Sequence, residues 1–269
     1  MTTSATPAPS FHALHSAPTP LLLTNVWDAA SAALVASSGA RAVATSSAGV
    51  AWSLGYPDGD ILPRHELLDA VARIVAVVDV PVTADIESGG RTPAEVADTV
   101  TGVVDAGAVG INIEDGDRSV PDAESRIVAA RRAAEGAGAE LFINARTDVY
   151  LRGLVPASQL VSETVTRARR YLDAGANGIF VPGLADLDVI AELVARIDAP
   201  VNIMVGPGSP AVGPLAAVGV RRLSLGSAPA QSAYALIAAA ARELEASGTY
   251  TSLGEGVDYG RLNALLERS

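Results

Sequence analysis

Carboxylates stand at the ends of two apolar segments that follow one another along the chain. Residues 82–90 read VTADIESGG and residues 110–116 read GINIEDG, so each segment passes from apolar and β-branched residues into acids and then glycine. Such runs are typical of buried parallel strands. Because side chains just past the strand ends of a β/α barrel converge on one pocket, Asp85, Glu87 and Glu114 are predicted to face one another.

Carboxylates confined together repel one another unless a cation neutralises them. Hard oxygen ligands suit Mg²⁺, with Mn²⁺ as the second candidate. The chain contains no cysteine, which excludes disulfides, zinc-thiolate sites and a thiol acid or nucleophile. His12, His15 and His65 lie in stretches expected to be helical or flanking, away from the strand ends, so we expect no catalytic role for them. We therefore predict a magnesium-dependent barrel enzyme.

Length and charge limit the classes of protein to consider. The chain has 269 residues and a net charge of −11. This length predicts a single (β/α)₈ domain over residues 1–269, with an N-terminal segment at 1–20 and a C-terminal helix and tail at 228–269. The negative charge argues against nucleic acid and membrane partners, whereas a small anionic carboxylate substrate could bind beside a metal and a local arginine. Residues 1–20 lack the pattern of a secretory signal, which predicts a cytoplasmic protein.

Strand-like and helix-like stretches alternate regularly, which is the main indication of the α/β fold class. Strands are expected at 21–25, 42–46, 82–85, 110–114, 141–144, 178–181, 201–204 and 220–224. Helices are expected at 11–17, 28–38, 63–78, 92–105, 122–135, 157–174, 187–197 and 231–247. This rhythm predicts a TIM-like (β/α)₈ barrel. A doubly wound open sheet is the alternative, but no Gly-x-Gly-x-x-Gly motif follows the first strand.

Short motifs along the chain resemble, in their order, those of the isocitrate lyase and phosphoenolpyruvate mutase superfamily. They are NVWDA from Asn25, TSSAG from Thr45, GYPD from Gly55, ADIESG from Ala84, IED from Ile113 and NARTD from Asn144. The resemblance covers roughly residues 21–230. It implies a barrel that holds a 2-oxo acid or its enolate on Mg²⁺. It also implies a homo-oligomer, a dimer or tetramer, in which the last helix can be exchanged between subunits.

The resemblance also implies roles for particular residues. Asp85 would ligate the metal directly, while Asp58, Glu87 and Glu114 would hold its water shell. The residues with an expected catalytic role are Asp58, Glu114 and Arg146. Those with an expected place beside the substrate are Trp27, Ser46, Ser47, Ala48 and Arg146. Asn202 is also expected at the pocket, because it lies in the predicted strand 201–204 just before the loop at 205–210.

Several of these residues also have a purely structural interpretation. Arg146 has the planar reach to pair with a substrate carboxylate or phosphonate, yet it could instead pair with Asp148 or Glu114. Ser46 and Ser47 could simply end a strand. Asp58 could belong to an ordinary turn.

The loop after Glu114 departs from the family pattern. Lyases of the superfamily carry a lid with a cysteine, and the mutase carries a Lys-x-Asn lid, but residues 114–126 contain no cysteine, lysine or histidine. Glu87 also replaces a commoner aspartate. These departures argue against an authentic isocitrate or methylisocitrate lyase and against an authentic phosphoenolpyruvate mutase.

The expected function is that of a Mg²⁺-dependent lyase-like enzyme. It would cleave a C–C bond of a small 2-oxo or 2-hydroxy carboxylic acid through an enolate. One alternative is C–P bond chemistry, as in a phosphonomutase or a phosphonopyruvate hydrolase. The other is a protein that binds a 2-oxo acid without turning it over.

Overall fold

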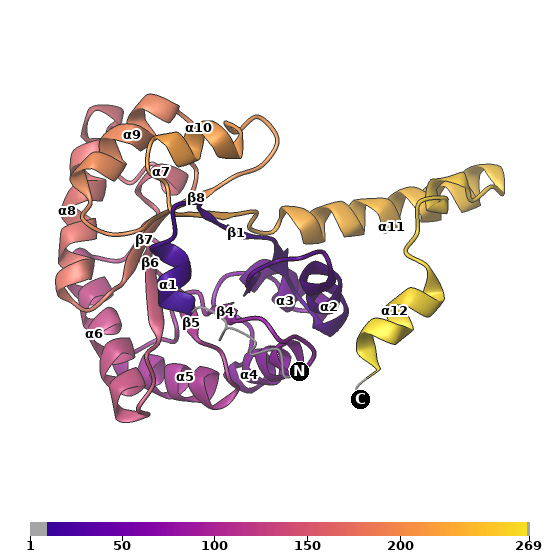
Figure 1. Cartoon of the computed structure of the whole chain (residues 1–269), viewed down its shortest axis with the longest axis horizontal. Helices are drawn as coiled ribbons and strands as arrows, with labels where there is room; N and C mark the ends of the chain where they lie inside the picture. The colour runs from indigo at the N-terminus through magenta and orange to yellow at the C-terminus, as the bar shows by residue number, and fades with distance from the viewer. Residues whose placement is uncertain (1–9, 268–269) are drawn as a thin grey trace, which may run out of the picture.

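A computed structural model describes residues 10–267 and shows parallel strands ringed by helices (Figure 1). The strands are β1 (Leu21–Leu23), β2 (Asn25–Val26), β3 (Val43–Thr45), β4 (Val82–Asp85), β5 (Gly110–Glu114), β6 (Phe142–Arg146), β7 (Gly178–Val181), β8 (Val201–Met204) and β9 (Arg222–Ser224). Their order is β1-β9-β8-β7-β6-β5-β4-β3-β2. Because only Thr24 separates β1 from β2, this order makes a nearly closed barrel. The predicted TIM-like fold is confirmed, although the expected strand 21–25 is split at Thr24.

Helices lie between successive strands on the outside of the barrel (Figure 1). The outer helices are α2 (Ala29–Ser37), α4 (Arg64–Val75), α5 (Pro93–Asp105), α6 (Val120–Gly136), α8 (Leu160–Asp173), α9 (Leu187–Arg196) and α10 (Val212–Ala217). Two predicted helix starts are confirmed by their caps. Asp28 accepts a hydrogen bond from the Ser31 N–H, and the Thr92 hydroxyl accepts one from the Glu95 N–H.

Two short helices lie where the sequence predicted only loops. They are α3 (Ser47–Ser53) and α7 (Val149–Arg152). Each is too short for a 3.6-residue repeat of apolar positions to show in the sequence. Some boundaries also differ: a 3₁₀ turn (Ala157–Gln159) precedes α8, which begins at Leu160 and not at 157.

A short helix, α1 (Phe11–His15), covers the N-terminal end of the barrel. Phe11 and Leu14 join the apolar cluster inside that end, together with Phe142 at the start of β6. The His15 ring stacks on Phe142 with ring centroids 3.8 Å apart. Burial, followed by the charge of Arg222, lowers the pKa of His15 to about 3. His15 is therefore an uncharged packing residue at the end of the barrel opposite the strand-end acids.

The C-terminal part of the chain leaves the barrel. Helix α11 (Ala228–Ser247) extends away from it, and α12 (Tyr259–Leu266) turns back toward α2 (Figure 1). Along α11, Leu236, Ile237 and Leu244 are 48%, 62% and 57% exposed. Within the described residues, no helix is both long and apolar enough to cross a bilayer.

Candidate active site

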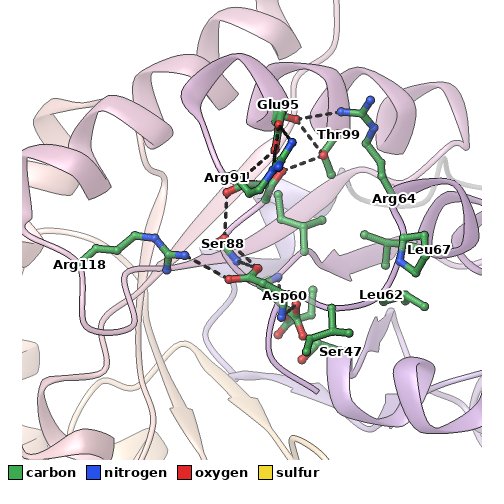
Figure 2. A pocket seen from close by; sticks show the side chains of 17 residues that line it. Ser47, Asp60, Leu62, Arg64, Leu67, Ser88, Arg91, Glu95, Thr99 and Arg118 are labelled. Carbon is green, nitrogen blue, oxygen red and sulfur yellow. Dashed lines mark hydrogen bonds and ion pairs between the residues drawn. The ribbon is translucent and has the colours of Figure 1, made fainter. Parts of the chain in front are cut away.

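A cavity of about 470 Å³ opens beside the C-terminal end of β4. Asp85 and Glu87 from the end of this strand line it, with Ser47 from the first turn of α3. Asp60 and Arg118 also line it, and Figure 2 shows the Arg118 guanidinium directed at the Asp60 carboxylate. Residues from three different loops thus meet at the strand-end acids, as expected for a β/α barrel.

Asp85 is the most deeply placed of these acids, with 8% of its surface exposed. Its Oδ1 accepts the Glu87 N–H at 3.1 Å, and its Oδ2 accepts from Asn112 Nδ2 at 3.3 Å. Burial raises the pKa of Asp85, while the nearby Arg146 charge opposes that rise. The result is a desolvated carboxyl group whose two oxygens are held in fixed directions.

Glu87 reaches the loop that carries Asp58 and Asp60. One carboxylate oxygen accepts the Gly59 N–H at 3.0 Å, and the other accepts the Asp60 N–H. Burial, and then a hydrogen bond with the Asp58 carboxyl group, raises the pKa of Glu87 to about 8. Two carboxyl groups this close must share a proton or a cation. The fold therefore brings Asp58 to the end of β4, as the sequence motifs implied.

Glu114 and Arg146 lie near Asp85 but do not line this cavity. Glu114 Oε2 lies 2.6 Å from Arg146 Nη1. Burial raises the pKa of Glu114 to about 7, although the Arg146 charge lowers it. Arg146 also pairs with Asp148, its Nε and Nη2 lying 2.7 and 3.1 Å from the two carboxylate oxygens. Each terminal nitrogen of Arg146 keeps one further N–H for another partner.

Asp115 is a buried acid for which sequence reasoning found no role in the site. It accepts hydrogen bonds from the Asp148 N–H, Arg167 Nη1 and the Tyr171 hydroxyl at 2.8, 2.8 and 2.7 Å. The spacing of Arg167 and Tyr171, four residues apart on α8, is the only sequence signal that they share a target. Asp115 therefore ties α8 to the segment that holds Asp148 beside Arg146.

Asp60 is a further residue that sequence reasoning missed. Its backbone is left-handed, with φ of 61°. Its carboxylate accepts the Ser88 N–H at 3.1 Å and the Ser88 hydroxyl at 2.8 Å, and it pairs with Arg118 at 3.2 Å. The sequence hint is the glycine before it, since Gly59 also has positive φ. Left-handed non-glycine residues often occur at functional sites.

The residues expected beside the substrate divide into two groups. Ser47 lines the cavity, and Ala48 follows it in the first turn of α3. Ser46 caps this helix, its hydroxyl accepting the Gly49 N–H at 3.3 Å.

Trp27 and Asn202 lie elsewhere. Trp27 borders a separate hollow of about 160 Å³ between α2 and α4. Asn202 is fully buried inside the barrel, where its Nδ2 donates to the Ser224 hydroxyl at 3.1 Å. The structure thus gathers Ser47 at the acid cluster and leaves these two side chains away from the cavity.

The donor chemistry of the acid cluster fits a hard divalent cation. Its ligand atoms are carboxylate oxygens, and burial raises the pKa values of Asp85, Glu87 and Glu114, although the Arg146 charge lowers those of Asp85 and Glu114. A cation would favour the ionised forms that burial disfavours. Among residues 10–267, no group of three or more His, Cys, Asp or Glu side chains could hold a metal ion by itself. An ion that keeps several waters, such as Mg²⁺, needs few direct protein ligands.

Residues 11–245 match the family model of phosphoenolpyruvate phosphomutase. The chain belongs to this family. With the relatives below, that match places it in the isocitrate lyase and phosphoenolpyruvate mutase superfamily, confirming the resemblance carried by the motifs. Family members whose names state an activity include lyases and mutases of small acids.

Several relatives are similar to this chain over most of its length. An uncharacterized protein of Mycobacterium tuberculosis is 38% identical over 96% of both chains. The 2-methylisocitrate lyase of Escherichia coli is 27% identical, covering 72% of this chain and 68% of the lyase. A solved structure, a provisionally named phosphonomutase from Burkholderia cenocepacia, is 44% identical with a TM-score of 0.82, covering 86% of this chain and 97% of its own.

Proposed function

We propose that this protein is a Mg²⁺-dependent lyase-like enzyme that forms an enolate from a small 2-oxo or 2-hydroxy carboxylic acid and cleaves a C–C bond. One observation carries the proposal. Asp58, Asp85, Glu87 and Glu114 gather at one end of the barrel, and burial raises the pKa values of Asp85, Glu87 and Glu114. A bound cation would compensate the charge of this cluster when its carboxyl groups are ionised, and its oxygen atoms suit Mg²⁺.

The residues at the site would then have complementary tasks. Asp85 would be the direct ligand, and Asp58, Glu87 and Glu114 would accept hydrogen bonds from the water shell. When bound, the ion supplies Lewis acid stabilisation of negative charge on the 2-oxygen of the substrate. Arg146 would use its free N–H groups for a substrate carboxylate, and the Ser47 and Ala48 segment at the start of α3 would contact the same anion.

Proton transfer needs a group that works without a lid cysteine. Glu114, whose burial raises its pKa to about 7, has a proton affinity suited to exchange near neutral pH. Asp58, whose carboxyl group lies beside that of Glu87, is the second candidate. The short loop after β5 instead supplies Arg118, which closes against Asp60.

C–P bond chemistry is the second candidate function. The observation that favours it is the 44% identity to the provisionally named phosphonomutase. The same acid cluster would serve such a reaction, with Asp58 in group transfer. Binding of a 2-oxo acid without turnover is the third outcome that the experiment below can reveal.

We further propose that the active form is a homo-oligomer. Helix α11 points away from the barrel and exposes Leu236, Ile237 and Leu244 (Figure 1). Apolar side chains gathered on a projecting helix mark a surface for another protein chain. A second copy of this chain, with α11 packed on or exchanged with its neighbour, is the simplest partner.

Deuterium exchange into the methyl group of pyruvate, followed by proton NMR, tests the proposed function. Exchange should require Mg²⁺, stop with a chelator and disappear in Asp85→Ala. In Asp58→Asn it should fall if Asp58 carries the proton and persist if Glu114 does. Absence of exchange in the native protein, with Mg²⁺-dependent binding of pyruvate or oxalate retained, would reject the enolate step in favour of C–P chemistry or simple binding.

A further inference from the structure

Polar side chains occupy one side of the barrel interior. Strands β5, β6 and β8 contribute Asn112, Asn144 and Asn202, and β9 contributes Arg222; all have 4% or less of their surface exposed. Branched apolar residues usually fill the interior of such barrels. Burying polar groups costs free energy unless they are hydrogen-bonded. A line of them across the interior therefore suggests a task other than packing.

The hydrogen bonds of Asn112 fix which way its amide faces. Its Oδ1 accepts from Asn144 Nδ2 and from Arg222 Nη2, each at 2.9 Å. With both donors on the oxygen side, the Nδ2 of Asn112 must face the other way, where it donates to Asp85 Oδ2 at 3.3 Å. Arg222 therefore reaches Asp85 through the amide of Asn112.

Among the described residues, Arg222 has no ion-pair partner in the core. Within the same residues, its Nε and Nη1 have no hydrogen-bond partner, and its bond to Asn112 is made by Nη2. Burial lowers the pKa of Arg222 to about 9, and the charge of Asp85 counteracts this effect. An arginine kept at such a cost, and directed at a single amide, has little to offer stability.

We propose that Arg222 is a positioning residue for the metal site: by fixing the amide of Asn112, it holds Asp85 Oδ2 in the direction needed for a divalent cation. The inference rests on the proposed function, because it takes Asp85 as the metal ligand. Asp85 lines the cavity, whereas the deeper Asn112 and Arg222 do not. The carboxylate thus lies between the guanidinium and the cation, and its negative charge reduces the repulsion between the two positive charges.

Calorimetric titration of the intact, chelator-treated protein with Mg²⁺, and with Mn²⁺ as a second probe, tests this inference. Arg222→Met keeps much of the side-chain length without the charge or donors. We expect roughly ten- to a hundredfold weaker metal binding, the range seen when partners of metal ligands are removed. Arg221→Met, at the neighbouring and partly exposed arginine, is the matched control and should bind metal as the native protein does.

A double-mutant cycle separates positioning from a general loss of structure. If Arg222 acts through Asn112, then Arg222→Met combined with Asn112→Ala should bind metal no more weakly than Asn112→Ala alone. Additive losses would overturn the inference, as would unchanged or tighter binding in Arg222→Met. Should Arg222→Met fail to fold, Arg222→Lys keeps the charge but not the planar fork. It should still lose affinity severalfold, and native affinity would overturn the inference.

A measurement without metal keeps this test distinct from that of the proposed function. In chelator, the side-chain NH₂ signals of Asn112 should shift in Arg222→Met and remain unchanged in Arg221→Met; unchanged signals in both would reject the role of Arg222. If the native protein binds metal through Asp85 and exchanges pyruvate protons, but Arg222→Met binds equally well, only the present inference fails. Native protein without Asp85-dependent metal binding would reject the proposed function.

Discussion

Glu87 and Asp60 hold each other at the mouth of the barrel. The Glu87 carboxylate accepts the Asp60 N–H, and the Asp60 carboxylate accepts the N–H of Ser88, the residue after Glu87. Both residues have left-handed backbones, with φ of 52° for Glu87 and 61° for Asp60. Such conformations cost free energy and persist where surrounding contacts enforce them. This mutual contact fixes the loop that carries Asp58.

Shortening Glu87 should release that loop. In Glu87→Asp the carboxylate is one methylene shorter and cannot reach the N–H groups of both Gly59 and Asp60. We expect a loss of about 1 kcal/mol in the free energy of unfolding, because water can replace part of the lost bonding. Hydrogen exchange at the Asp60 amide should become faster. Glu95→Asp, which alters an exposed pair with Arg91, is the control and should leave that amide protected.

The stability of the metal-free protein should fall as pH rises from about 5 to 8. The folded state raises the pKa of Glu87 from 4.5 to about 8 and that of Glu114 from 4.5 to about 7, so it binds more protons than the unfolded chain in this window. Ionisation of Glu87 and Glu114 as the pH rises through this window therefore weakens the folded state. Melting temperatures measured in chelator should show the fall.

Mg²⁺ should reduce this pH dependence, because the cation replaces the protons as compensating charge. Glu87→Gln should flatten the melting profile even without metal. A native profile in chelator that rises between pH 5 and 8 would contradict the assignment of these carboxyl groups.

Arg146→Lys should weaken binding of oxalate, a stand-in for an enolate or 2-oxo acid, in the presence of Mg²⁺. Lysine cannot keep the paired contact with Asp148 while presenting N–H groups to a ligand. Loss of one charge-assisted bond corresponds to roughly ten- to a hundredfold in affinity. Arg152→Lys is the control, since Arg152 pairs with the same Asp148 from a half-exposed position. Equal weakening in both variants would assign the effect to Asp148.

Asp115→Asn should strongly destabilise the fold. The carboxylate of Asp115 accepts three hydrogen bonds in the interior. Replacing it with an amide removes the negative charge that pairs with Arg167. Breaking a buried ion pair in this way costs roughly 3–5 kcal/mol, measurable by urea denaturation. Tyr171→Phe removes one neutral donor and should cost less, about 1–3 kcal/mol. A larger loss in Tyr171→Phe would show that the hydroxyl, not the ion pair, dominates.

Ile237→Glu on α11 should disrupt the proposed oligomer. The side chain is 62% exposed on the projecting helix, and a charge there would be buried at a subunit interface. Sedimentation should show native protein heavier than the 27.3 kDa chain and the variant shifted toward that mass. Val212→Glu on α10, at an apolar position that is 43% exposed, serves as the control. Native protein that sediments as a monomer would reject this proposal.

Local patterns in the sequence determine the barrel and the acids at its mouth. Apolar runs such as 82–85 and 110–114 become β4 and β5, and the last residue of each strand is an acid, Asp85 or Glu114. The strands and helices can be predicted from neighbouring residues, because strand periodicity and helix caps depend on side chains only a few positions apart. The order of the motifs also indicated that Asp58 belongs beside them.

Contacts between polar side chains that are far apart in the sequence form only in the folded barrel. Asp60 meets Ser88 across 28 positions of sequence, and Arg222 meets Asn112 across 110. The asparagines in the middle of β5, β6 and β8 were a visible signal, yet each by itself is only a polar residue in an apolar strand. Strand pairing and barrel closure give them common partners, and no local propensity encodes such contacts.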